Sequence, residues 1–83
     1  DLPPLRERKE DIPELVGFFI RQYNARQGVN VVEVSLQAMA ALQQYSWPGN
    51  IRELSNAIER AMLFCDGMTI HLGDLPRDVT TTS

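Results

Sequence analysis

Apolar residues in the first third of the chain recur at intervals of three and four, which places them on one face of a helix. The positions on this face are Ile12, Leu15, Val16, Phe19 and Tyr23. Asp11 precedes them as a helix N-cap and Gly28 follows as a left-handed stop, so the pattern predicts a helix over residues 12–27. Phe18 falls off this face, and we expect it either to be an exposed residue or to contact a neighbouring domain.

A second helix is predicted over residues 36–45, with Ser35 as its N-cap. Its broad apolar face consists of Leu36, Met39, Leu42 and Tyr45, with Ala38 on the far edge. Pro48 and Gly49 then interrupt the helical pattern. Trp47, just before them, is predicted to pack between the second helix and a third.

The third helix, predicted over residues 51–66, has a regular apolar stripe. The stripe consists of Ile51, Leu54, Ala57, Ile58, Ala61, Met62 and Cys65. Because Cys65 lies on the stripe, we interpret it as a small buried residue and not as a reactive thiol. Arg52, Asn56 and Leu63 lie on the opposite side, which leaves Arg52 free to reach away from the domain's own core.

The remaining segments are short and irregular. Residues 1–10 form a proline-led, charged lead-in, and residues 29–34 are β-branched but without an evident pairing partner, so we expect an extended connector. Residues 72–75 suit one helical turn, and the polar residues 79–83 are typical of the start of a linker. The sequence thus predicts an all-α fold, a small bundle of three main helices plus a short C-terminal helical turn.

Composition limits what such a domain can do. The 83 residues suffice for one small domain with a modest core, too small for a catalytic site built wholly inside it. With only one cysteine and one histidine, Cys65 and His71, no internal disulfide can form and we predict no metal site. These features, and the lack of any apolar run near the ~20 residues of a membrane span, predict a cytoplasmic location and no membrane contact.

The segment from Trp47 to Leu54 has the most informative local chemistry. Asn50 is predicted to cap the third helix, and Glu53 to reach back as in a capping box. Arg52 places a cation in the first helical turn, which is unfavourable for the helix dipole but is a suitable position for binding an anion. Arg52 is therefore either a solvated surface residue or a group that binds phosphate or carboxylate.

Motifs for independent catalysis are missing from the sequence. No G-x-x-x-x-G-K-[ST] phosphate loop is present, and no Ser/His/Asp or Cys/His set has plausible partners. The carboxylates are explained by capping and solvation. We therefore expect this chain not to be an enzyme by itself.

Two motifs carry a resemblance to a known family. The segment LPPLRER at residues 2–8, followed by Glu10-Asp11-Ile12, resembles the start of the C-terminal lid subdomain of the AAA+ ATPase module in sigma-54-dependent bacterial transcription activators. The segment YSWPGNIREL at residues 45–54 is similar to that family's sensor II segment, and Ile70 with residues 74–76 resembles the subdomain's end. The likeness covers nearly the whole chain.

The resemblance implies a nucleotide-binding role for particular residues. Arg52 would be the sensor II arginine, which contacts the nucleotide phosphates and completes the parent's ATP site. Pro48, Gly49 and Asn50 would lie near the nucleotide, and the hinge around residues 5–12, including Ile12, would run close to the adenine. ATP with Mg would bind to the parent protein, whereas we expect no tight binding to this chain alone.

The resemblance also implies a domain organisation and partners. Residues 1–10 would be a hinge from a preceding α/β ATPase subdomain, residues 11–76 the helical lid, and residues 77–83 the start of a linker to a DNA-binding domain. The parent would form a ring, usually a hexamer with neighbouring protomers, and use ATP hydrolysis to remodel sigma-54 RNA polymerase. It would thus be a bacterial transcription regulator of the one-component or two-component type.

Two alternatives belong to other functional classes. The second and third helices resemble a helix-turn-helix in outline, with Arg52, Asn56 and Arg60 on a recognition helix. The net charge of −3 and Glu53 and Glu59 on the same helix disfavour that interpretation, and we expect no direct binding of nucleic acid. The other alternative is an interaction domain with no nucleotide role.

Overall fold

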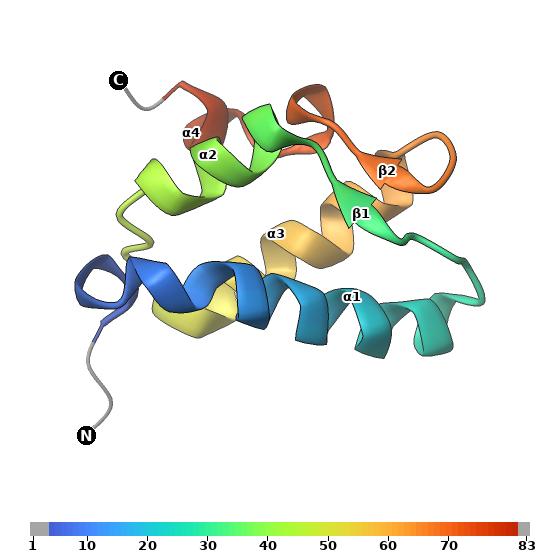
Figure 1. Ribbon diagram of the computed structural model, residues 1–83, viewed down its shortest axis with the longest axis horizontal. Helices are drawn as coiled ribbons and strands as arrows, with labels where there is room; N and C mark the ends of the chain where they lie inside the picture. Colours follow the sequence, from blue (N-terminus) through green and yellow to red (C-terminus); the bar gives the residue numbers. More distant parts are fainter. Residues whose placement is uncertain (1–3, 82–83) are drawn as a thin grey trace.

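The computed structural model describes residues 4–81 and is all-α in architecture, as predicted (Figure 1). Two short 3₁₀ turns, η1 (Leu5–Glu7) and η2 (Lys9–Asp11), lead into three long helices, and a short helix follows near the C-terminus. The long helices are α1 (Ile12–Gln27), α2 (Leu36–Gln44) and α3 (Asn50–Phe64). The motif residues Leu2 and Pro3 lie outside the described residues.

Helix α1 has the bounds that its apolar pattern predicts. Gly28 ends it with a φ of 68°, a left-handed conformation that glycine adopts without steric cost. The buried residues of α1 are Ile12, Val16, Phe19, Ile20 and Tyr23, and Leu15 is partly buried beside them. Asp11 precedes the helix as expected, but its carboxylate bonds to Arg8 and caps no backbone group. Phe18 is 51% exposed, which agrees with its place off the apolar face.

Helix α2 begins as predicted but presents a different face to the core. The Ser35 hydroxyl accepts a hydrogen bond from the Ala38 N–H at 3.1 Å, so the N-cap prediction is confirmed. Ala38 and Leu42 are fully buried, whereas Leu36 is 90% exposed. Placing Leu36 on the buried face was therefore wrong. At 3.6 residues per turn, Leu36 lies roughly 120° around the helix from Leu42 and roughly 160° from Ala38, so it lies away from the side that buries those two residues.

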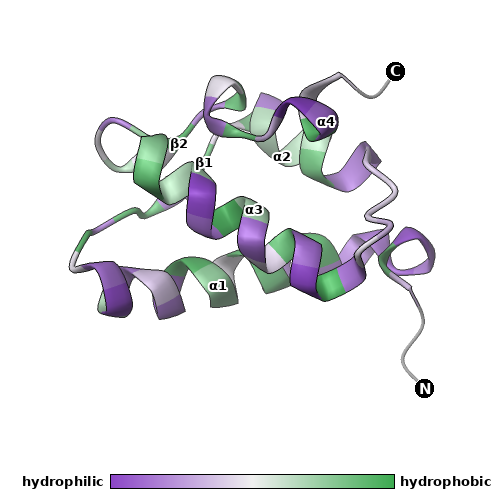
Figure 2. Cartoon of the chain, turned by 180° about the vertical axis from the view of Figure 1, so that it is seen from behind, coloured by the Kyte–Doolittle hydropathy of each residue, from purple (hydrophilic) through white to green (hydrophobic). Residues whose placement is uncertain are grey.

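Helix α3 carries the predicted stripe. Leu54, Ala57, Ile58, Ala61 and Met62 are buried, and the ends of the stripe, Ile51 and Cys65, are partly buried. Figure 2 shows the alternation of hydrophobic and hydrophilic residues along this helix. Helix α3 packs along α1, and this contact forms the centre of the domain.

Two extended segments pair where the sequence predicted only a connector. Strand β1 (Glu33–Val34) lies parallel to β2 (Thr69–Ile70), and the Val32 N–H donates to the Met68 carbonyl at 2.8 Å just before the pair (Figure 1). The expectation that residues 29–34 lack a pairing partner was therefore wrong. The partner strand comes after both α2 and α3 in the sequence, so no local pattern indicates it.

The C-terminal part adds a short helix to the predicted turn. The 3₁₀ turn η3 (Leu72–Asp74) confirms the predicted turn before Pro76. Helix α4 (Arg77–Thr80) follows, within residues that the sequence predicted as linker, and Val79 is buried against the core. The folded unit thus extends past Pro76, and residues 82–83 lie outside the described part.

The core joins the four α-helices of the described part. It consists of Leu5, Ile12, Val16, Phe19, Ile20, Tyr23, Val31, Ala38, Leu42, Trp47, Leu54, Ala57, Ile58, Ala61, Met62, Ile70, Leu75 and Val79. Within residues 4–81, no helix is both long enough and apolar enough to cross a bilayer.

Candidate functional site

The predicted site residues cluster at a tight turn between α2 and α3. The Asn50 N–H donates to the Trp47 carbonyl at 2.8 Å, which closes a four-residue turn. Gly49 has φ −89° and ψ 8°, values typical of the third position of a type I turn, and Pro48 occupies the second position that such turns favour. Pro48, Gly49 and Asn50 are all exposed, so the turn lies at the surface directly before α3.

Trp47 anchors this turn to the core. Its side chain is fully buried, and the indole Nε1–H donates to the Leu42 carbonyl at 2.7 Å. The Tyr45 ring meets it edge-on, with ring centroids 4.8 Å apart. The Trp47 backbone is left-handed, with φ 54°, which is strained for a bulky residue. Its bond to Leu42 of α2, and its place beside Glu53 and Ala57 of α3 along one pocket, agree with the predicted position between the second and third helices.

Glu53 connects the turn to the helix that follows. One carboxylate oxygen accepts from the Gly49 N–H at 2.8 Å, and the other accepts from the Tyr45 hydroxyl at 3.0 Å. A Cβ atom added to Gly49 would lie 2.8 Å from the Glu53 Cβ, so this close approach requires glycine. The acidic group in the first turn also suits the positive end of the helix dipole.

The prediction that the Asn50 side chain caps the first turn of α3 is wrong. Gly49 occupies the N-cap position, and Glu53 reaches back to Gly49 and not to Asn50. The Asn50 side-chain oxygen accepts instead from the Leu5 N–H at 3.0 Å, a group 45 positions earlier. Asn50 has a φ of 55°, which turns its side chain away from the first turn of its own helix.

Arg52 lies in the first turn of α3 and is exposed. Its guanidinium has no hydrogen bond or ion pair with any of residues 4–81. Asn56, one turn later, is exposed beside it, as the helical pattern predicted. A guanidinium without a partner, beside the N-terminal end of a helix, is available to an anion such as a phosphate.

Ile12 lies apart from this exposed group. It begins α1 and its side chain is fully buried in the core. The structure therefore brings Pro48, Gly49, Asn50 and Arg52 together at one surface but places the Ile12 side chain inside the domain. Ile12 fixes the path of the residues before it by its burial.

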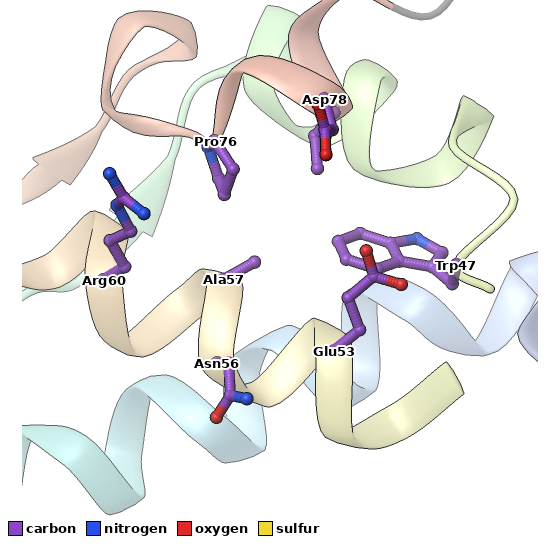
Figure 3. Close-up of a pocket in the computed structure, with 8 residues that line it drawn as sticks. Trp47, Glu53, Asn56, Ala57, Arg60, Pro76 and Asp78 are labelled. Atoms are coloured by element: carbon purple, nitrogen blue, oxygen red, sulfur yellow. The ribbon is translucent and has the colours of Figure 1, made fainter. Parts of the chain in front are cut away.

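A pocket of about 210 Å³ lies between α3 and α4, next to the turn (Figure 3). Its lining consists of Trp47, Glu53, Asn56, Ala57, Arg60, Pro76, Asp78 and Val79. Charged groups of both signs, Glu53, Asp78 and Arg60, surround an apolar floor. This mixture gives the pocket no clear preference for a nucleotide phosphate.

Two pKa shifts describe the surroundings of the turn and of the end of α3. Burial, and then the hydrogen bond to Glu53, raises the pKa of the Tyr45 hydroxyl, so Tyr45 stays a neutral donor. Burial, and then the nearby Asp74 and Asp66, raises the pKa of the Cys65 thiol, which agrees with a structural role. No group of three metal-ligating side chains occurs among the described residues.

Sequence reasoning missed two contacts of the lead-in. The Leu5 N–H bonds to Asn50, and the Lys9 ammonium donates to the Gln44 carbonyl at 3.1 Å. Both partners are at least 35 positions away, so no spacing pattern could indicate them. The one available signal was Leu5 itself, an apolar residue among charged neighbours, which proves to be buried.

Comparison with known proteins identifies a family. Residues 6–83 match the family model of the AAA+ ATPase lid domain. The chain is 48% identical over 82 residues to the transcriptional regulatory protein ZraR of Klebsiella oxytoca, covering 99% of this chain and 18% of that protein. It is 50% identical over 74 residues to the sigma54-dependent transcriptional activator SfnR of Pseudomonas putida, covering 89% of this chain and 20% of that protein.

A solved structure has the same fold. NtrX from Brucella abortus, crystallised in complex with ADP, superposes with a TM-score of 0.86 at 40% identity, over 93% of this chain and 18% of that one. A second NtrX crystal structure, in complex with ATP, matches equally well. The chain thus spans about a fifth of the length of the relatives that it matches.

Proposed function

The chain belongs to the AAA+ ATPase lid domain family, as found in sigma-54-dependent bacterial transcriptional activators, and we propose that it completes an ATP site with Arg52. In this proposal Arg52 is the sensor II arginine, and it contacts the phosphates of a nucleotide bound mainly by a preceding α/β subdomain. Pro48, Gly49 and Asn50 form the turn that faces the nucleotide. Ile12 is fully buried, so in this proposal it acts by fixing the path of the chain before α1.

The exposure of the Arg52 guanidinium, and its lack of a partner within residues 4–81, carry the proposal. The guanidinium is exposed, has no partner within residues 4–81, and begins a helix whose preceding turn is held by Trp47, Glu53 and Asn50. A rigid turn places the arginine reproducibly, and a free guanidinium is available for an external anion. The crystal structures of the relative NtrX with ADP and with ATP support a nucleotide as that anion.

The proposed mechanism links ATP to the position of the lid. Phosphoryl transfer spreads negative charge over oxygen atoms, and an arginine with its charge fixed nearby stabilises that distribution. Mg would be held by the missing subdomain and would neutralise part of the same charge. When the γ-phosphate leaves, Arg52 loses a partner, so the preferred lid position changes.

At the level of the parent protein, this change would drive a ring of protomers. We place the chain in a cytoplasmic ATPase, a hexamer in the usual family arrangement, that couples hydrolysis to activation of sigma-54 RNA polymerase. The chain itself carries no phosphate loop, so it contributes to the ATP site but does not hydrolyse ATP alone. The helix-turn-helix alternative receives less support, because the net charge is −3 and Glu53 holds the turn before the supposed recognition helix.

The test is ATP turnover by the AAA+ protein that carries this chain, with Arg52→Ala. We expect kcat to fall by at least about 10-fold, because removal of one fixed donor to a charged transition state commonly costs 10²-fold or more. The melting temperature should change by less than about 3 °C, since surface substitutions without partners cost little.

Arg21→Ala is the matched control, because Arg21 is an exposed arginine within α1 and is not part of the turn. We expect this variant to turn over ATP at the wild-type rate. Equal turnover in wild type, Arg21→Ala and Arg52→Ala would contradict the proposed role of Arg52.

A further inference from the structure

The lead-in segment, defined as Leu5–Asp11, is attached to the helices at three places. The Leu5 N–H donates to the Asn50 side-chain oxygen at 3.0 Å, and the Lys9 ammonium donates to the Gln44 carbonyl at 3.1 Å. The Leu5 side chain is buried, as is that of Ile12 directly after the segment. The lead-in segment is thus part of the folded lid and not a free connector.

The bond from Leu5 is the one that reaches the turn before Arg52. Asn50 lies two positions from Arg52, at the start of α3. Among residues 4–81, the Asn50 oxygen is the only acceptor found for the Leu5 N–H. A buried N–H without an acceptor is costly, so this bond fixes the lead-in segment relative to the turn.

The backbone at Asn50 limits which residues can make this bond. Its φ of 55° is left-handed, a conformation that glycine, asparagine and aspartate adopt more readily than other residues. Glycine has no side-chain acceptor. Only asparagine and aspartate therefore combine the required backbone with an oxygen at the required distance.

We propose that Asn50 is a positioning residue, which fixes the lead-in segment on the first turn of α3 and so sets the orientation of Arg52 relative to the incoming chain. The proposal rests on the proposed function of Arg52. The same contacts hold Leu5–Asp11 against the helices, so the lead-in segment and the first turn of α3 keep one relative position. In this role Asn50 acts through Arg52, which it positions.

The first test is hydrogen exchange at the Leu5 amide in the AAA+ protein that carries this chain. In Asn50→Gly, which keeps the left-handed backbone but lacks the oxygen, we expect exchange to be at least about 10-fold faster, because the amide loses its acceptor. In Asn50→Asp, which keeps both, exchange should stay within about 3-fold of wild type. Exchange at Leu5 that is unchanged in Asn50→Gly would overturn the proposal.

The second test asks whether Asn50 acts through Arg52. ATP turnover is measured for Asn50→Gly, Arg52→Ala and the double variant. We expect Asn50→Gly to lower kcat by at least about 3-fold in the wild-type background and to have no further effect in the Arg52→Ala background, since residues that act as one unit are not additive. A purely structural role would lower turnover in both backgrounds.

The outcomes distinguish this proposal from the one on which it rests. Multiplicative effects of the two substitutions, or an unaltered kcat in Asn50→Gly, would overturn the positioning role while leaving Arg52 as a phosphate contact. Unaltered turnover in Arg52→Ala would overturn both proposals. The exchange rate at Leu5 would still report directly whether the Asn50 bond exists.

Discussion

At the scale of single residues, the turn before α3 depends on groups whose roles differ although they are adjacent. Trp47 fixes the turn by burial, Glu53 by accepting two hydrogen bonds, and Asn50 by bonding to the lead-in segment. Arg52 makes none of these internal contacts. The neighbours of Arg52 thus maintain the structure, and this leaves its guanidinium available for a ligand.

Gly49→Ala should destabilise the domain. The added Cβ would lie 2.8 Å from the Glu53 Cβ, a contact that only a shift of the turn or of the helix relieves. We expect a loss of about 1–3 kcal/mol in the free energy of unfolding, the usual cost of overpacking. Urea denaturation of wild type and variant measures it.

Gly73→Ala is the control for Gly49→Ala. A Cβ at Gly73 meets nothing within 4 Å, so the free energy of unfolding should change by less than about 0.5 kcal/mol. If both variants unfold at the same urea concentration as wild type, the close approach of Gly49 to Glu53 has no energetic significance.

Tyr45→Phe should change how stability depends on alkaline pH. The pKa of Tyr45 is raised above its usual 10.0 in the folded state. The hydroxyl's contribution to the free energy of unfolding is therefore fully present below pH 10 and is lost as the pH rises through the folded-state pKa. Removing the hydroxyl should cost about 1 kcal/mol at neutral pH through the lost bond to Glu53. Unfolding measured between pH 7 and about pH 11 should show the difference between wild type and variant shrinking at the alkaline end. A difference that stays constant over this range would contradict the argument.

At the scale of elements, the local signals of the sequence predict the helices well. Gly28 and Ser35 mark helix boundaries by chemistry confined to a few residues, and both predictions are confirmed. The predictions that are wrong depend on distant partners. Strand β1 pairs with β2 across two helices, and Asn50 bonds to Leu5 instead of to its own helix.

Leu36 illustrates the same limit within one helix. Periodicity groups it with Leu42, but which part of a broad apolar face is buried depends on the surfaces that the other helices present. Ala38 and Leu42 meet those surfaces and Leu36 does not. A pattern of hydrophobic positions therefore predicts a helix more reliably than it predicts the rotation of that helix against the core.

Ser35→Ala should lower stability through α2. The hydroxyl accepts from the Ala38 N–H, and loss of such an N-cap costs about 1 kcal/mol. Ser46→Ala is the matched control, since Ser46 is exposed and its hydroxyl has no bond with any of residues 4–81. Thermal unfolding should separate the two variants by several degrees, about 4–8 °C for a domain of this size. Equal melting temperatures would show that α2 does not need this cap.

At the scale of the whole molecule, the lead-in segment, the turn and α3 act as one unit. The segment is bonded to α3 through Asn50 and to the end of α2 through Lys9, and Leu5 and Ile12 are buried. The sequence predicted the residues of the candidate site from a motif, and the structure places four of them at one surface. It could not predict the attachment of the lead-in segment, because contacts over 35 or 45 positions leave no periodic signal.

The central claim is that Arg52 contacts the phosphates of a nucleotide held by the adjoining ATPase subdomain. A crystal structure of the AAA+ protein that carries this chain, with a non-hydrolysable ATP analogue and Mg, measures this contact directly. We predict a guanidinium nitrogen of Arg52 about 2.7–3.2 Å from a phosphate oxygen, the range of charge-assisted hydrogen bonds. An occupied nucleotide site with the Arg52 guanidinium still in solvent, or paired with a carboxylate, would contradict the claim.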